Sequence, residues 1–343
     1  METKIVDPTT YSDWNNFIID NFDPDIFHSA EWCRVLRAAY NFIPRYFLFI
    51  NDTQPVAIFP LMELCSIITG QRAISLPFSD FCHPLTKSDS HLELMKREII
   101  DYGHIRHWRY VEFRSSHFSK NIAPYKLYYT HDIDLTTSLS ELWAELKDNN
   151  KRNIKKAMRL GLKVRFEKNW QSLKEFYKLQ VITRKRHGLP PQPFKFFTSI
   201  YKEILSRDLG IIASVYYKEK MIAASIFFNF NRKALFKYGA SDHRYHQLRP
   251  NNLIMWEAIN WHKSLECFTL NLGRSSPDDS GLLAYKRLWG VKESILYYYR
   301  FSFAKNNYVR SPADKIVPVT ALLAVLPKSL LVFLGKYFYR HFS

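Results

Sequence analysis

The chain has 343 residues, of which 47% are hydrophobic and 24% are charged. This balance excludes a disordered or fibrous protein, and the length predicts about two domains. The 49 Lys and Arg residues outnumber the 32 Asp and Glu residues, which gives a formal net charge of +17.

The positive charge is concentrated in the second part of the chain. Residues 1–140 hold 13 Lys or Arg against 17 Asp or Glu, whereas residues 141–343 hold 36 against 15. This asymmetry indicates a polyanionic partner for the second part: a nucleic acid, a phosphorylated cofactor or an anionic membrane. Charge that only serves solubility is the alternative at this point.

The cysteines and the amino terminus predict a reducing compartment. Cys33, Cys65, Cys82 and Cys267 are too few for a disulfide scaffold and are not at metal-ligand spacing. No HExxH or comparable histidine spacing occurs, so we expect no metal. The first residues carry acids and no apolar core, unlike a signal peptide, so we expect a cytoplasmic protein.

The first part of the chain predicts helices at its start and short strands after them. We expect helical structure over about the first 35 residues, with a second helix from an N-cap at Ser29 to Tyr40. A further helix is expected over residues 91–102. The predicted strands lie within residues 44–51, 55–64, 72–78, 109–113 and 125–133.

The second part opens with a predicted helix at 139–147 and a strongly basic segment. Between Lys147 and Lys168, nine basic residues stand against two acidic ones. Apolar residues at helical spacing predict a helix that ends at Gly161. Its basic side is either a solvated face or an anion-binding face.

The later elements predict a mixed sheet. They are helices at 170–187 and 194–206, strands at 210–217, 220–230 and 233–241, a helix from Pro250, a strand at 267–272, a helix at 281–290 and a strand at 294–301. The three consecutive strands argue against a Rossmann sheet or a barrel. One βαβ crossover would leave the helix N-terminus at 250–252 opposite a strand end, where phosphates commonly bind.

A known family shares these motifs in this order. The matching stretches between residue 28 and about residue 290 are HSAEWCRVL, LPFSDFCHPL, KRNIKKAMRLGLKV, TRKRHGLPPQP, KYGASDHRYHQLRPNNLIMWEAI, LNLGRSS and YKRLWG. As a set they resemble the FemABX-like branch of the GNAT acyltransferases. The resemblance implies an α/β (α+β) fold with two tandem GNAT-like domains, whose mixed, largely antiparallel sheets are flanked by helices.

The resemblance also implies a division of the chain and a function. We expect an N-terminal GNAT-like domain over 1–140, a C-terminal GNAT-like acyltransferase domain over 141–304 and a basic, apolar tail over 305–343. The family moves an acyl or aminoacyl group from a phosphorylated donor to an amine. The expected co-substrate is acyl-CoA or aminoacyl-tRNA, and the expected partner is an amine-bearing cell-envelope or polysaccharide precursor.

The predicted donor site departs from the usual GNAT pattern. Ordinary GNAT domains hold the CoA pyrophosphate in a Q/R-x-x-G-x-G/A loop, whereas residues 247–252 read QLRPNN, without glycine. Glycine lets the backbone approach a phosphate closely, so its absence favours a carrier other than CoA without deciding it. The predicted cofactor-binding residues are Arg249, Asn251, Asn252 and Arg274.

Three residues are candidates for the transfer itself. Asp80, in an aromatic turn that the resemblance places near the inter-domain cleft, is expected to orient or deprotonate the amine, or else it caps the turn. Lys286 is expected to neutralise a phosphate or the oxyanion, unless it is a surface lysine. Tyr238 is a candidate general acid, although strand tyrosines usually pack in cores.

A second group of residues is expected to contact the substrate. Arg184, Arg186 and His187 end a helix just before a proline-stiffened loop, so they are expected to contact phosphate, although a helix C-terminus attracts cations by itself. Asp242 follows a strand and faces the predicted anion site.

The end of the chain is apolar and basic. Pro318, Pro327 and Lys328 interrupt the apolar run 316–334, so we expect an interfacial anchor on an anionic membrane and not a span. The chain would then bind the cytoplasmic face of the inner membrane. A helical hairpin packed on the protein is the alternative.

Two functions without catalysis would use the same features. One is a module that binds tRNA or another nucleic acid, and the other is a membrane-surface adaptor that retains the fold. Replacing Asp80 distinguishes the first from the enzyme, because only the enzyme needs this acid.

Overall fold

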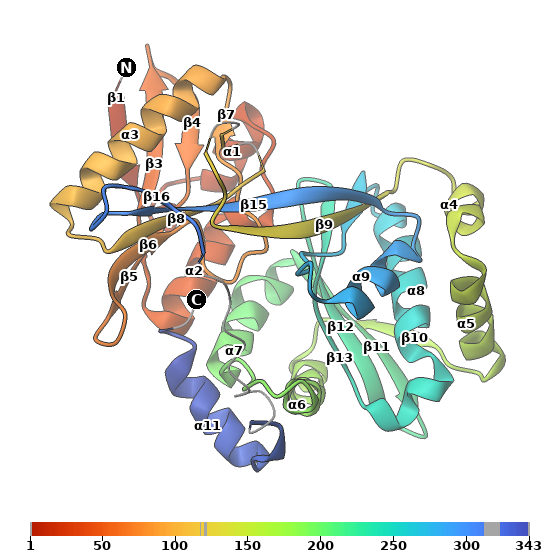
Figure 1. The fold of residues 1–343 in the computed structure, drawn as a ribbon. Coiled ribbons are helices and arrows are strands. Elements are labelled where there is room, and N and C mark those ends of the chain that lie inside the picture. Colours follow the sequence, from red (N-terminus) through yellow and green to blue (C-terminus); the bar gives the residue numbers. More distant parts are fainter. Residues whose placement is uncertain (1, 117, 120–121, 312–322, 342–343) are drawn as a thin grey trace. The chain divides into compact units, whose positions relative to one another are not determined.

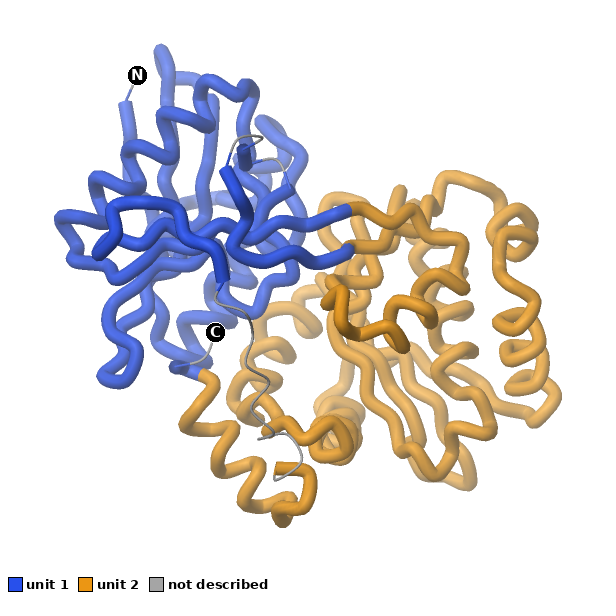
Figure 2. The backbone as a smooth tube through the Cα atoms, in the orientation of Figure 1, with its two compact units in different colours: residues 1–129, 295–315, 340–343 blue, residues 130–294, 316–339 orange. Residues whose placement is uncertain are grey.

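The chain forms two compact units in the computed structural model. Unit 1 comprises residues 1–129, 295–315 and 340–343, and unit 2 comprises residues 130–294 and 316–339 (Figure 2). The structure describes residues 2–116, 118–119, 122–311 and 323–341.

Unit 1 contains two sheets. The first is antiparallel, in the order β1-β3-β4-β7, and in the second β15, β8, β6, β5 and β2 follow one another, with β16 paired to β15 (Figure 1). Only β6 and β8 pair in parallel. The strands are β1 Glu2–Val6, β2 Ile43–Pro44, β3 Tyr46–Asn51, β4 Gln54–Phe59, β5 Met62–Ser66, β6 Gly70–Ile74, β7 Leu85–Thr86, β8 Tyr110–Arg114, β15 Lys292–Ser302 and β16 Asn307–Val309.

The helices of unit 1 cover these sheets. Ser29 caps α2 through its side chain, as predicted, and Ser88 caps α3 in the same way. Aromatic side chains such as Phe47, Phe59 and Phe113 form a core shared with α3. The helices are α1 Trp14–Asn21, the 3-10 turn η1 Ile26–His28, α2 Ala30–Tyr40 and α3 Asp89–Ile105.

The prediction of helix at the start of the chain is wrong for β1. Residues 2–6 form a strand that pairs antiparallel with β3, from Glu2 opposite Ile50 to Val6 opposite Tyr46. Five residues are too few to show a period, and the β-branched end of this segment suits the edge of a sheet.

Unit 2 is built on one mixed sheet. Its strands follow in the order β10-β11-β12-β13-β14-β9, antiparallel except for β13 and β14. The strands are β9 Lys126–Asp134, β10 Val164–Glu167, β11 Gly210–Tyr217, β12 Lys220–Phe230, β13 Lys233–Ser241 and β14 Thr269–Asn271. β9 begins in unit 1, and β15 begins in unit 2 and continues into unit 1.

Helices cover both faces of this sheet. Ile211, Ala213 and Val215 of β11 share a core with Leu253 and Ala258 of α8, and α6 and α7 lie on the other face (Figure 1). β11 is therefore buried on both sides, which explains its continuous apolar sequence. The helices are α4 Leu139–Glu145, α5 Asp148–Arg159, α6 Trp170–Arg186, α7 Phe194–Glu203, η2 Leu205–Arg207, η3 His243–Leu248, α8 Pro250–Ser264, α9 Ser280–Arg287 and α11 Lys328–Phe338.

The structure confirms the predicted fold class. Both units combine helices with mixed, largely antiparallel sheets, and each helix and strand predicted between 139 and 301 is present. The division at 140 and 304 stays a prediction. The chain first passes from unit 1 to unit 2 between residues 129 and 130, and it returns to unit 1 between residues 294 and 295.

The predicted tail lies partly outside the described residues, which resume at 323. α11 packs against α6, with Leu331 fully buried. Within the described ranges, no helix combines the length and the apolar character that crossing a bilayer requires.

Candidate functional site

The two parallel strands of unit 2 separate near the predicted donor site. β13 pairs with β14 only through residues 233–235, opposite Thr269–Asn271. Beyond this point β12 is the neighbour of β13, and a bulge between Ile226 and Phe227 shifts the register. A bulge increases the local twist and turns a strand away from its neighbour. The far half of β13, after residue 235, therefore extends beyond its pairing with β14.

The N-terminus of α8 follows directly from this half of β13. Arg249 precedes the helix in the left-handed conformation (φ 61°, ψ 38°), and its side chain forms no capping bond. Pro250 occupies the first turn, where its missing N–H costs nothing. The first-turn N–H groups and the helix dipole favour an anion here.

Polar side chains join this N-terminus to the end of β13 and to α6. The Ser241 hydroxyl bonds His246 Nε2 at 2.9 Å and accepts a bond from Asn251 Nδ2 at 3.3 Å. Thr183 Oγ1 accepts from the Ser241 N–H at 2.9 Å and donates to its carbonyl at 3.1 Å. The end of β13, the start of α8 and the last turns of α6 thus form one connected site.

Four basic side chains gather at this site, and we call them the α8 cluster: Arg186, His187, His246 and Arg249. Burial, and then the positive charges of Arg186, His243 and Arg249, lower the pKa of His246. Burial and the charges of Arg186 and Arg184 lower the pKa of His187. At neutral pH, the two arginines therefore carry the charge of the cluster.

Two predicted ligands use their side chains within the protein. The Asn252 amide donates to Asn150 Oδ1 at 2.6 Å, and both residues are buried. Asp242, which is 1% exposed, accepts two bonds from the Arg244 guanidinium at 2.9 and 2.6 Å. The hydrogen bonds from Arg244 hold the pKa of this carboxyl well below its usual range. Asn252 therefore ties α8 to α5, and Asp242 caps η3.

Arg184 points away from the α8 cluster toward the end of the chain. Its guanidinium donates to the Tyr339 hydroxyl at 2.6 Å and to the Pro190 carbonyl at 3.3 Å. The Tyr339 hydroxyl donates to the same Pro190 carbonyl at 3.0 Å. Arg184 therefore holds the proline loop and the residue after α11 together.

Lys286 is buried beneath the loop that follows β14. It is 3% exposed, and its ammonium donates to the carbonyls of Gly273 at 2.7 Å and Arg274 at 3.2 Å. It is therefore not a surface lysine, and it fixes the backbone that carries Arg274. Nearby, burial and then the Lys286 charge lower the pKa of His131, whose Nε2 contacts Glu293 at 2.9 Å.

Tyr238 and Asp80 occupy different surroundings. Tyr238, on the far half of β13, packs its ring edge-on against Phe197 of α7, 5.3 Å away. Asp80 belongs to unit 1, where its carbonyl accepts from the Tyr298 hydroxyl at 2.6 Å. The other predicted site residues belong to unit 2. The predicted roles of all these residues stay predictions.

Thr183, Ser241 and His246 were not among the site residues predicted from the sequence. The first comes one residue before the predicted basic group, and the other two flank the predicted Asp242 within five residues. Their closeness in the sequence to predicted site residues could have indicated that they belong to the same site. The bond between Thr183 and Ser241, 58 residues apart, depends on the packing of α6 against β13.

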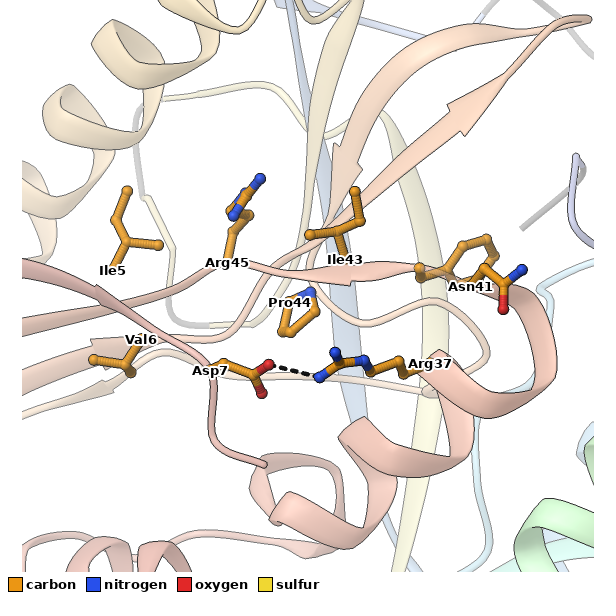
Figure 3. A pocket seen from close by; sticks show the side chains of 9 residues that line it. Ile5, Val6, Asp7, Arg37, Asn41, Ile43, Pro44 and Arg45 are labelled. Carbon is orange, nitrogen blue, oxygen red and sulfur yellow. Dashed lines mark hydrogen bonds and ion pairs between the residues drawn. The ribbon is translucent and has the colours of Figure 1, made fainter. Parts of the chain in front are cut away.

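Across the described ranges, no group of three or more His, Cys, Asp or Glu side chains could hold a metal ion. In unit 1, a pocket of about 340 Å³ lies beside the Asp7–Arg37 ion pair, with Asn41, Pro44 and Arg45 around it (Figure 3). None of the predicted site residues lines this pocket.

The comparison with protein families identifies the part of the chain that holds the site. Residues 145–287 match the model of the acetyltransferase (GNAT) domain. They contain α5 to α9, the separation of β13 from β14 and the α8 cluster. This part of the chain is a GNAT-type acyltransferase domain. A search of curated proteins finds no match to the sequence.

Solved structures share the fold of this chain over most of its length. FemX is similar over 89% of this chain and 98% of its own, with a TM-score of 0.68 and 12% identity. A tandem GNAT protein from the clavulanic acid biosynthesis pathway covers 91% of this chain and 99% of its own, at a TM-score of 0.55 and 9% identity.

A third similar structure is a single domain of a larger protein. It is the C-terminal domain of a putative lysylphosphatidylglycerol synthetase from Agrobacterium fabrum. The match covers 85% of this chain and 90% of that one, with a TM-score of 0.56 and 12% identity. The predicted FemABX-like, tandem GNAT fold is therefore confirmed.

Proposed function

We propose that this GNAT acyltransferase moves an acyl or aminoacyl group from a phosphorylated carrier to an amine on a cell-envelope or polysaccharide precursor. The observation that carries the proposal is the α8 cluster at an uncapped helix N-terminus, beside the half of β13 that β14 leaves. The names of the similar structures, FemX and a lysylphosphatidylglycerol synthetase, support an acceptor at the envelope.

In this proposal, the α8 N-terminus holds the phosphates of the carrier. Arg249 and Arg186 supply charge, and the backbone N–H groups of Asn251 and Asn252 supply donors aligned with the helix dipole. Asn252 contributes its backbone because its side chain is bonded to Asn150. The acyl arm of the carrier would lie along the half of β13 that extends beyond its pairing with β14.

The transfer needs a neutral amine, a stabilised oxyanion and a protonated leaving group. Tyr238 lies on the far half of β13 and is the proposed general acid for the leaving group. Lys286 is proposed to act by fixing the 273–274 backbone, which sets the position of Arg274. Asp80 is proposed to orient the acceptor amine.

The basic face of α5 favours a long polyanion as donor. Arg152, Lys155, Lys156 and Arg159 are exposed, and none forms an ion pair with another described residue. α5 packs against α8 and is joined to its first turn by the Asn150–Asn252 bond. A charged tRNA would reach both the α8 cluster and this face, whereas the pyrophosphate of acyl-CoA needs only the cluster.

A donor-binding experiment tests the proposal. Acetyl-CoA, a long-chain acyl-CoA and a charged tRNA are each titrated into the full chain at 50 and 200 mM salt. A donor at about 100 times its Kd should stabilise the protein by about 2.7 kcal/mol, seen as a higher Tm. Arg249→Gln should weaken binding by about tenfold or more, since it removes a charge-assisted contact.

Matched variants separate the donors. Arg207→Gln removes an exposed arginine that forms an ion pair with Glu203, four residues before it. Arg207 is not part of the α8 cluster, so this variant should leave donor binding unchanged. Lys155→Gln with Lys156→Gln should weaken the binding of tRNA and leave the binding of acyl-CoA unchanged. Failure of all three donors to bind, or equal losses in Arg249→Gln and Arg207→Gln, would overturn the proposal.

A further inference from the structure

α11 has one face that packs on unit 2. Leu331 is fully buried, and a Cβ added at Gly335 would come within 2.0 Å of the Pro191 carbonyl oxygen, so the helix lies directly on the proline loop. Just after the helix, the Tyr339 hydroxyl bonds Arg184 and the Pro190 carbonyl. These contacts fix which side of α11 faces away from the protein.

The other face of α11 is apolar and exposed. Leu330, Phe333 and Tyr337 are 42%, 55% and 50% exposed, and their spacing of three and four residues puts them on one side of the helix. The rings of Phe333 and Tyr337 contact each other, with centroids 4.7 Å apart. Three large apolar side chains in one exposed stripe mark an interaction surface.

The charges beside this stripe are positive. Lys336 and Arg340 are exposed next to it. The sequence from residue 315 to residue 343 contains four Lys or Arg residues and no Asp or Glu. A second copy of the same face would bring these cations together, whereas an anionic surface would neutralise them.

We infer that the stripe Leu330–Phe333–Tyr337 of α11 binds the surface of an anionic lipid bilayer. The apolar side chains would enter the boundary between headgroups and acyl chains, with Lys336 and Arg340 at the phosphates. Tyrosine suits this depth because its ring is apolar and its hydroxyl is polar. The helix lies on the bilayer with its packed face still held by the proline loop and α6.

The inference deepens the proposed function by naming the residues that would hold the enzyme at its acceptor. It does not depend on the choice of donor, because α11 is separate in sequence from the α8 cluster and from α5. Bilayer binding and donor binding can therefore be measured independently on the same variants.

Vesicle sedimentation of the full chain tests the inference. Phosphatidylcholine vesicles are compared with vesicles containing phosphatidylglycerol, and the chain should bind only the latter with appreciable affinity. Phe333→Ser with Tyr337→Ser should reduce the partition coefficient by at least about tenfold, since both rings leave the interface. Lys336→Gln with Arg340→Gln should reduce the partition coefficient on anionic vesicles only.

The matched control is Met158→Ser with Leu160→Ser. These side chains are 43% and 47% exposed at the basic end of α5, so the control removes exposed apolar surface beside cations elsewhere. It should bind vesicles like the unmodified chain. An equal loss in both double variants would overturn the inference.

Two more outcomes are decisive. Failure of the unmodified chain to bind anionic vesicles overturns the inference, and so does a concentration-dependent dimer that Phe333→Ser with Tyr337→Ser dissociates. Donor binding in the α11 variants should equal that of the unmodified chain, and an unchanged Tm shows that they are folded. If the proposed function fails instead, donors do not bind but vesicle binding persists.

Discussion

His262 is enclosed in the core of unit 2 without a polar partner among the described residues. It is 1% exposed, its two ring nitrogens make no hydrogen bond, and its ring lies 5.5 Å from that of Phe227. Burial lowers its pKa from 6.5 to about 4. The imidazole is therefore neutral in the folded chain at every pH where the protein is expected to work.

This burial predicts a loss of stability in weak acid. Above pH 6.5 the ring is neutral in both states, but between pH 6.5 and about 4 only the unfolded chain takes up the proton. The free energy of unfolding should fall by about 1.4 kcal/mol per pH unit there, or about 2 kcal/mol between pH 7 and 5. In urea unfolding, the His262→Met variant should not show this fall in the free energy of unfolding between pH 7 and 5.

The control is His104→Met, at an exposed histidine of α3. It should keep the full pH dependence of the unmodified chain. A slope in His262→Met equal to that of the unmodified chain would show that another group is responsible.

His246 predicts a second pH effect, on donor binding. Burial and the neighbouring positive charges lower the pKa of His246, and a phosphate bound beside it would raise this pKa. Donor binding should therefore take up a proton, and affinity should rise several-fold as the pH falls from 7.5 to 6. Calorimetry in two buffers of different ionisation enthalpy measures the uptake.

His246→Gln provides the comparison, since the ionisation of the donor itself is the same for both proteins. The variant should bind the donor with a flatter pH dependence and less proton uptake. Identical uptake by both proteins would exclude His246 from the anion site.

At the scale of elements, one bond joins the basic helix to the candidate site. Asn150 of α5 is fully buried, accepts from Asn252 of α8 at 2.6 Å and donates to the Leu288 carbonyl at 3.3 Å. Asn252→Ala leaves the Asn150 oxygen buried without this donor. The variant should lose about 1–3 kcal/mol of unfolding free energy in urea, as a broken buried hydrogen bond does.

The same variant tests the prediction that Asn252 is a donor ligand. If only its backbone N–H contacts the phosphates, Asn252→Ala should retain donor affinity within about twofold, in spite of its lower stability. A tenfold or greater loss of affinity would assign the side-chain amide to the donor. Asn150→Ala, which breaks the bond from the other side, is the control for stability alone.

Elements of unit 2 were predictable because each carries its own pattern. The apolar runs of β11 to β13, the proline at the start of α8 and the glycine after α5 are local signals that packing did not override. β1 was missed because five residues carry no period, and its partner β3 lies 40 residues away. Order and type of elements followed from the sequence, whereas edge pairing did not.

The site was predictable in place but not in detail. QLRPNN was correctly located at a helix N-terminus beside a strand end. However, Asn252, Asp242 and Arg184 were all expected to face a ligand, and each makes a bond inside the protein. Two of those partners, Asn150 and Tyr339, are more than 100 residues away, and no local pattern indicates them.

At the scale of the whole molecule, the charge of the chain belongs to distinct surfaces. Basic residues of 141–343 form the exposed face of α5, part of the α8 cluster and the cations beside α11, while Lys286 is internal. A single net charge thus combines surfaces that we assign to a donor and to a bilayer. Salt should weaken both, so each must be measured with its own ligand.

α6 supports both of these surfaces with two consecutive residues. Arg184 bonds Tyr339 beside α11, and Thr183, one residue earlier, holds Ser241 of the donor site. A bilayer that changes the Arg184–Tyr339 contact therefore acts on the same helical turn that holds Ser241 through Thr183. By thermodynamic reciprocity, the factor by which a bilayer changes donor affinity must equal the factor by which donor changes bilayer affinity. A loaded enzyme and an unloaded one would then differ in how long they stay at the membrane.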